Sequence, residues 1–176
     1  MPNWCDNVVV VKHKNKEALN RVEKAFEEGN LCQEFIPVPK ELINARAPNY
    51  SNNAQVLKNK YGYSDWYDFC INEWGTKWDV DEGSCVKGDG TLTLSFVSAW
   101  SPPTGLYKKL LDEGYDVKAY YFEPGVMFAG MFSADGNEYY EIHSIEQAKA
   151  DLPKELDEMM SITESLVELK EEMENQ

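Results

Sequence analysis

The chain has 176 residues, of which 43% are hydrophobic and 27% charged, and its formal net charge is −14 at pH 7. A chain of this length buries about 70% of its unfolded surface and needs neither disulfides nor metals to fold. Such a negative charge disfavours binding to nucleic acid and to anionic membranes; it favours a basic partner or simple solvation, and solvation is the commoner reason. No stretch of sequence approaches the ~20 apolar residues of a membrane span.

The cysteines and histidines give no sign of a metal or a cofactor. Cys5, Cys32, Cys70 and Cys85 show no CxxC or other tight spacing, and the two histidines are far apart in the sequence. Cys70 lies in an acidic segment, which disfavours a thiolate, so we assign no catalytic residue. Isolated cysteines and the lack of a signal-peptide pattern predict a cytosolic protein.

The first predicted elements are a strand, a helix and a second strand. Residues 7–12 form a continuous β-branched run, which is typical of a buried strand. Asn15 is the expected cap of a helix that continues to residue 28. Residues 31–36 predict a second short strand, and residues 48–63, rich in Asn, Ser, Gly and Tyr, predict a long loop.

The most unusual stretch is residues 64–79. It contains three of the five tryptophans, which are Trp66, Trp74 and Trp78. Ser64 is the predicted N-cap of a helix that ends at Gly75. The aromatic side chains either pin an inserted segment onto a sheet or form the wall of a binding site, in which Lys77 makes a cation–π contact. The residue pattern leaves both roles open.

The next region returns to regular structure. Residues 81–90 predict a loop, and the alternating residues 91–97 predict a strand. Ser101 is the expected cap of a helix whose first turn holds Pro102 and Pro103. The remaining predicted strands are 115–122, 126–132 and 138–142, joined by tight turns at Pro124-Gly125 and Asp135-Gly136.

The C-terminal segment is strongly acidic. Residues 151–176 hold nine acids and two lysines, so this segment carries half of the net charge of −14. A short helix begins at residue 144, and Pro153 opens a longer one with apolar residues at helical spacing: Leu152, Leu156, Met159, Ile162, Leu166, Leu169 and Met173. We favour packing of this stripe on the sheet, and a homodimer through residues 152–173 is the alternative.

These elements predict an α+β fold. Without an insertion at 37–90 they form a ferredoxin-like β-α-β-β-α-β sandwich, with helices on one face of an antiparallel sheet and an added β-hairpin. The insertion is expected between the second and third strands. The predicted organisation is a ferredoxin-like domain over 1–142 and an acidic amphipathic helical segment over 143–176.

One composite site is expected where several strings converge. In an antiparallel sheet of this topology, the start of the first strand and the end of the third lie close together. The residues predicted to bind a ligand or partner are Asn3, Trp4, Trp66, Trp74, Gly75, Thr76, Lys77, Trp78, Asp79, Trp100, Ser101, Pro102 and Glu123.

Four strings resemble, in order and spacing, the YubB-type family of small phage and conjugative-plasmid proteins. They are MPNWCDN, the pair WY followed by EWGTKWD, AWSPP, and YFEPGVMFAG, and they span about residues 1–132. The resemblance implies a ferredoxin-like domain, a mobile-element source and the cytoplasm of a bacterial host. It implies no established enzymatic activity, and the acidic C-terminal helix is not part of it.

Two functions are compatible with these observations. The first is a non-enzymatic accessory protein that binds a host factor, basic or nucleic-acid-handling, to counter host defence. The second is a module or weak enzyme that holds a nucleotide-like ligand at the tryptophans around Lys77. Direct nucleic-acid binding is disfavoured because the chain is acidic and lacks RNP-type strings.

Overall fold

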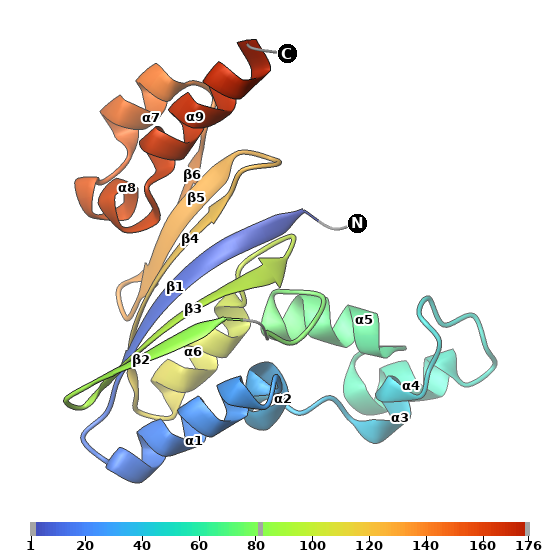
Figure 1. Ribbon diagram of the computed structural model, residues 1–176. Coiled ribbons are helices and arrows are strands. Elements are labelled where there is room, and N and C mark those ends of the chain that lie inside the picture. The colour runs from blue at the N-terminus through green and yellow to red at the C-terminus, as the bar shows by residue number, and fades with distance from the viewer. Residues whose placement is uncertain (1–2, 81–82, 175–176) are drawn as a thin grey trace.

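The computed structural model of the protein describes residues 3–80 and 83–174. Within these residues the fold is α+β, with one six-stranded antiparallel sheet in the order β2-β3-β1-β4-β5-β6 (Figure 1). The strands are β1 (Trp4–Lys12), β2 (Ser84–Gly88), β3 (Thr91–Ala99), β4 (Asp116–Glu123), β5 (Phe128–Ser133) and β6 (Gly136–Glu141).

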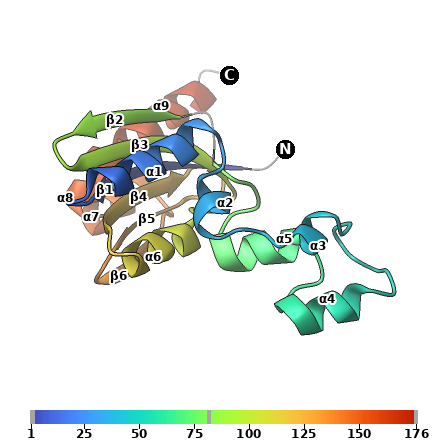
Figure 2. The same ribbon diagram turned by 90° about the horizontal axis from the view of Figure 1, so that it is seen from below.

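Helices cover both faces of the sheet. They are α1 (Lys16–Glu27), α2 (Leu31–Phe35), α3 (Lys40–Ile43), α4 (Ala54–Tyr61), α5 (Trp66–Phe69), the π-helical turn η1 (Cys70–Trp74), α6 (Thr104–Asp112), α7 (Ile145–Asp151), α8 (Lys154–Met160) and α9 (Ile162–Glu174). Helices α1 and α6 pack on one face, and α7–α9 pack on the other face near β4–β6 (Figures 1 and 2). Within the described residues, no helix is both long and apolar enough to cross a bilayer.

The larger core lies between the sheet and helices α1 and α6. Successive side chains of a strand point to opposite faces of the sheet. In the β-branched run of β1, Val9 and Val11 are therefore buried on one face, whereas Val8 and Val10 are half-buried on the other. The core continues through alternate residues of β3, through the helices and into the insertion; its members include Leu92, Leu94, Phe96, Val22, Phe26, Leu106, Leu110, Phe69 and Trp74.

The apolar stripe of the C-terminal segment is mostly used inside the chain. Leu156, Ile162 and Leu166 are buried in a second core with Tyr120 and Phe122 of β4. Met159 and Leu169 remain exposed. The homodimer through residues 152–173 stays a prediction. Few apolar side chains of the described stripe are exposed and so accessible to a second copy of the chain.

The prediction of one long helix after Pro153 was wrong. Ser161 has a left-handed backbone (φ 49°) and ends α8. Asp157 then caps the next helix, because its carboxylate accepts hydrogen bonds from the backbone N–H of Thr163 (2.7 Å) and from the Thr163 hydroxyl (2.8 Å). The break lets both α8 and α9 place apolar residues on the sheet.

The predicted strand at residues 31–36 was also wrong. This segment is helix α2, and the Asp79 carboxylate accepts the N–H groups of Cys32 and Gln33 at 2.7 Å each. A cap supplied from 46 to 47 residues away leaves no local signal. The second strand is instead β2, inside the segment 81–90 that was expected to be a loop, so the insertion precedes the second strand.

Three further local predictions need correction. Asp65 rather than Ser64 caps α5, because its carboxylate accepts the N–H of Asp68 at 3.1 Å. Ser101 does not cap α6, which begins at Thr104. Its hydroxyl instead donates to the backbone oxygen of Gly75. The expected loop at 48–63 contains helix α4.

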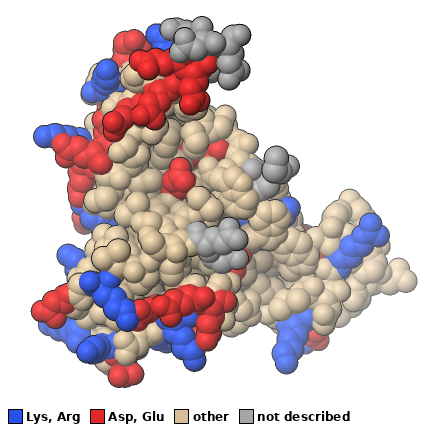
Figure 3. All heavy atoms as spheres, in the orientation of Figure 1, with Lys and Arg blue, Asp and Glu red and all other residues tan. Residues whose placement is uncertain are grey.

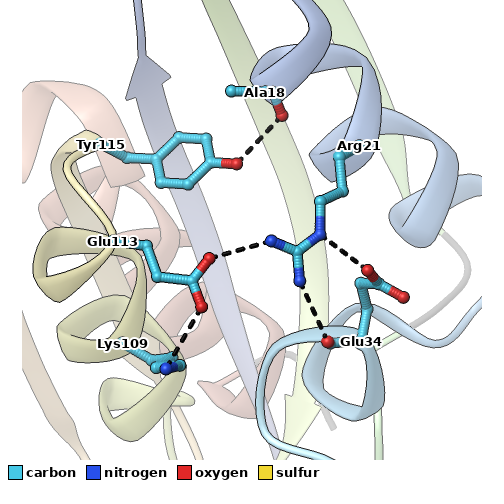
Figure 4. A network of polar contacts seen from close by, with 6 residues as sticks. All are labelled: Ala18, Arg21, Glu34, Lys109, Glu113 and Tyr115. Carbon is cyan, nitrogen blue, oxygen red and sulfur yellow. Dashed lines mark hydrogen bonds and ion pairs between the residues drawn. The ribbon is translucent and has the colours of Figure 1, made fainter.

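Polar contacts fasten the helices of the larger core to one another (Figure 4). The guanidinium of Arg21 on α1 donates to Glu34 of α2 (2.7 Å) and to Glu113 after α6 (2.9 Å). The Tyr115 hydroxyl donates to the backbone oxygen of Ala18 at 3.1 Å. Because the pairs are partly exposed, each contributes only about 0–1 kcal/mol, and we assign the network to helix placement.

One tight helix contact joins the insertion to α6. A Cβ atom built at Gly105 of α6 would lie 1.9 Å from the backbone oxygen of Glu73 in η1. Only glycine allows this approach. Residues 37–63, with α3 and α4, project away from the sheet beyond it (Figures 1 and 2).

We therefore expect Gly105→Ala to lower the free energy of unfolding by about 3 kcal/mol, because η1 and α6 must separate. Gly88→Ala is the matched control, since its Cβ would meet its nearest neighbour at an ordinary 3.6 Å. It should change stability by less than about 1 kcal/mol. Urea unfolding of both variants measures the difference, and equal stabilities would contradict the close approach.

Candidate functional site

Three segments that are distant in sequence meet beside the end of β3. The backbone N–H of Trp100 donates to the backbone oxygen of Asn3 at 2.9 Å, which ties the end of β3 to the start of β1. The hydroxyl of Thr76, a fully buried residue, donates to the Ala99 oxygen at 3.0 Å. The convergence expected from the sheet topology is therefore present in the structure.

A second pair of contacts closes this junction. The Ser101 hydroxyl donates to the backbone oxygen of Gly75 at 2.5 Å. Gly75 itself has a left-handed backbone (φ 89°), and a Cβ atom there would lie 3.0 Å from the oxygen of Pro102. Gly75, Ser101 and Pro102 thus hold the chain together at this junction.

The fourth string reaches the same place through the β4–β5 turn. Glu123 is fully buried, and its carboxylate accepts the backbone N–H groups of Gly125 (3.0 Å) and Val126. Asn3 packs against this turn, since a Cβ atom at Gly125 would lie 2.6 Å from Asn3 Nδ2. Glu123 is therefore a brace for the turn, whereas Asn3 is exposed.

The tryptophans divide into buried and exposed ones. Trp74 is 5% exposed, and its indole N–H donates to the Ile36 oxygen at 2.8 Å. This bond and the burial of its ring in the larger core hold η1 in place. Trp66 is half-buried, whereas Trp4, Trp78 and Trp100 expose 46%, 41% and 39% of their surface.

Two of the exposed tryptophans and a tyrosine surround Lys77. Its ammonium lies 4.4 Å from the ring centroid of Trp78, 5.0 Å from that of Trp100 and 5.9 Å from that of Tyr67. The Trp4 and Trp78 centroids are 6.2 Å apart, and those of Tyr67 and Trp100 are 6.4 Å apart. We call these five residues the tryptophan patch: Trp4, Tyr67, Lys77, Trp78 and Trp100.

Aromatic rings contact the ammonium of Lys77. Among the described residues, no carboxylate lies within ion-pair distance of its ammonium. Each cation–π contact contributes about 0.5–1 kcal/mol at an exposed site. The lysine is thus positioned by aromatic faces with its charge available to a partner.

The predicted site residues therefore have two roles. The structural ones are Trp74, Gly75, Thr76, Asp79, Ser101, Pro102 and Glu123. The ones that present accessible surface are Asn3, Trp4, Lys77, Trp78 and Trp100, and Trp66 does so in part. Sequence reasoning missed Tyr67, although its place next to Trp66 in an aromatic helix was the available signal.

The partly buried acid and the buried thiol beside the junction have raised pKa values. Burial raises the pKa of Asp79, while hydrogen bonds from three backbone N–H groups oppose that rise. Burial, and then the charge of Asp79, raises the pKa of Cys70 to about 12. Within residues 3–80 and 83–174, no three His, Cys, Asp or Glu side chains are grouped as metal ligands.

Comparison with known proteins leaves the family open. No family model matches the chain, and no curated protein matches it. A crystal structure of protein api92 from Yersinia pseudotuberculosis, of family DUF1281, superposes with a TM-score of 0.47 at 10% identity, over 82% of this chain and 100% of that one. A likeness this distant indicates no function, and the YubB-type resemblance stays a prediction.

The division of the tryptophans predicts different costs of truncation. Trp74→Ala should lower the free energy of unfolding by about 3–5 kcal/mol, as is usual for a buried aromatic residue. Trp78→Ala should lower it by about 1 kcal/mol, because two-fifths of that side chain is already exposed. Chemical denaturation of the two variants measures both changes in the free energy of unfolding. A loss in Trp78→Ala as large as that in Trp74→Ala would show that Trp78 also pins the insertion onto the sheet.

The thiols should be inert in the folded protein. Cys5, Cys32 and Cys70 are buried, and burial raises the pKa of each. At about pH 8 we expect a disulfide reagent such as Ellman's reagent to modify at most the half-buried Cys85 within minutes. All four should react after denaturation. Rapid modification of Cys70 in the native protein would reopen a catalytic role.

Proposed function

We propose that the protein is a non-enzymatic binding protein that contacts a protein partner through the tryptophan patch. The observation that carries this proposal is the exposure of Trp4, Trp78 and Trp100, each near two-fifths, in one connected group around Lys77. Tryptophan is enriched among the few residues that dominate binding energy at interfaces. A contiguous exposed aromatic patch is costly unless a partner covers it.

The degree of exposure favours a macromolecular partner. Sites for small molecules enclose most of the ligand surface between concave walls. Rings with two-fifths of their area in contact with water lie on an outer surface instead. Lys77 adds a positive charge in the middle of the patch, so the partner is expected to place an acidic or carbonyl group there.

We infer that the fold is ferredoxin-like. Strands β2-β3-β1-β4 are adjacent in the order of that fold, and α1 and α6, which follow β1 and β3, pack on one face. This topology requires residues 28–83 to be an insertion between the first helix and the second strand. Strands β5 and β6 extend the sheet beyond β4.

The YubB-type resemblance supports a host factor as the partner, in the cytoplasm of a bacterium that carries a phage or plasmid. All four strings that carry the resemblance meet at the junction beneath the tryptophan patch. Countering host defence is the role proposed from this context. The net charge of −14 favours a partner that is basic elsewhere on its surface.

A nucleotide-like ligand is the second candidate, favoured by the ammonium of Lys77 between aromatic rings. A phosphate would pair with Lys77, and a base would stack on Trp78 or Trp4. Quenching of tryptophan fluorescence by a nucleotide panel, lost in Lys77→Ala, would support this candidate. No quenching and no thermal shift with any nucleotide would exclude it.

The partner proposal is tested by photocrosslinking in bacterial cells. A crosslinking amino acid at position 78 should yield a discrete adduct with one host protein. The control places it at Tyr139, an aromatic residue on β6 outside the patch that is 54% exposed against 41% for Trp78, and no such adduct is expected there. Adding Lys77→Glu and Trp100→Ala to the first protein should abolish the adduct. The same adducts from both positions, or none, would contradict the proposal.

A further inference from the structure

The charge of this acidic protein is distributed unevenly. We call residues 37–63 the basic lobe, because it holds four cations and one acid, Glu41, in a chain of net charge −14. The cations are Lys40, Arg46, Lys58 and Lys60. Figure 3 shows Asp and Glu gathered over α7–α9, at the other end of the molecule, and mainly Lys and Arg on the lobe that contains α3 and α4.

Most of the positive charge of the lobe is not paired within the described residues. Lys60 forms an ion pair with Glu41 at 2.9 Å. Lys40, Arg46 and Lys58 are exposed, and none of them has a carboxylate of the described chain within ion-pair distance. The lobe therefore presents a local positive surface.

A hollow of about 550 Å³ opens on this lobe. Its walls include Asn44, Arg46, Pro48, Asn49, Tyr50 and Asn53. Tyr50 is 90% exposed, which is the largest exposed fraction among the exposed large hydrophobic residues of the described chain. Amide groups, a guanidinium and an accessible ring thus surround a space of the size that takes a small organic group, roughly 300–1,000 Å³.

The loop that carries Tyr50 is fixed by its neighbour. The Asn49 side-chain amide donates to the Ser64 oxygen at 2.7 Å, and the Asn49 N–H donates to the buried carboxylate of Asp65 at 3.1 Å. Asp65 in turn caps α5. The Tyr50 ring is exposed to solvent, and the backbone that carries it is fixed by these hydrogen bonds. The loop therefore loses little conformational entropy when the ring binds a ligand.

We propose that the basic lobe binds single-stranded nucleic acid, with Arg46 and Lys58 on phosphates and Tyr50 stacked on a base. Single-strand sites combine cations that follow the backbone with aromatic rings on which bases stack. The acidic helices α7–α9 repel a nucleic acid at the basic lobe only weakly, because salt screens exposed charges beyond about 8–10 Å. The amides of the hollow suit the donor and acceptor edges of unpaired bases.

An acidic protein is the competing partner. Ile43 and Val56, both exposed on the lobe, would suit it. The ring, guanidinium and amides around one hollow favour the nucleic acid, because Ile43 and Val56 do not line that hollow. This inference is independent of the tryptophan patch, so either proposal can fail alone.

The test is fluorescence anisotropy of a labelled single-stranded oligonucleotide of about 12 nucleotides, of mixed sequence, titrated with the intact protein at about 50 mM salt. Binding should weaken with salt, with a slope of log K against log salt of about −1.4 for the two phosphates that Arg46 and Lys58 neutralise. Arg46→Glu and Lys58→Glu should each reduce affinity at least about 10-fold, and Tyr50→Ala about 10-fold.

Lys154→Glu is the matched control. It makes the same change of net charge on α8, where the side chain is 87% exposed, and should alter affinity less than about two-fold. Thermal melting checks that all four variants fold. No binding by the wild type overturns the proposal, as does an equal loss in Lys154→Glu or unchanged binding in the lobe variants. Capture of an acidic protein by the lobe without any oligonucleotide binding would assign it to the competing partner.

Discussion

The structure depends on one junction, where residues 73–76 are fastened to the turn that leaves β3. Thr76 bonds to the Ala99 oxygen, Ser101 bonds to the Gly75 oxygen, and Gly105 lets α6 approach the backbone of Glu73. These contacts are short and nearly all involve the backbone. They anchor a long insertion to the sheet, and the exposed rings beside them keep their positions because the backbone beneath is fixed.

The junction also explains why so many tryptophans occur together. Trp74 faces inward and seals the insertion against the core. Trp78 and Trp100 follow the fastened segments and face outward around Lys77. Beyond the junction, the insertion ends in the basic lobe, far from the acidic helices α7–α9 (Figure 3). Two surfaces of different chemistry are thus held on one small domain.

Sequence reasoning could predict the convergence of the site, because strand pairing alone places the start of β1 beside the end of β3. It also located most of β1, β3, β4 and β5 from their apolar patterns.

Sequence reasoning failed where a distant partner decides the local structure. Asp79 makes a helix of residues 31–35 by capping it from far along the chain, and β2 is a short, mostly exposed edge strand with a polar pattern. Tertiary contacts override local preference in both cases. Likewise, no residue type distinguishes the buried Trp74 from the exposed Trp78, because burial depends on the packing of the whole insertion.

Hydrogen exchange of the indole N–H groups, followed by NMR, distinguishes buried tryptophan rings from exposed ones. We expect strong protection for Trp74, whose N–H is bonded to Ile36, and rapid exchange for Trp4, Trp78 and Trp100. Protection of Trp78 and Trp100 comparable to that of Trp74 would contradict this expectation, because those rings would then belong to the core and not to a surface that contacts a partner.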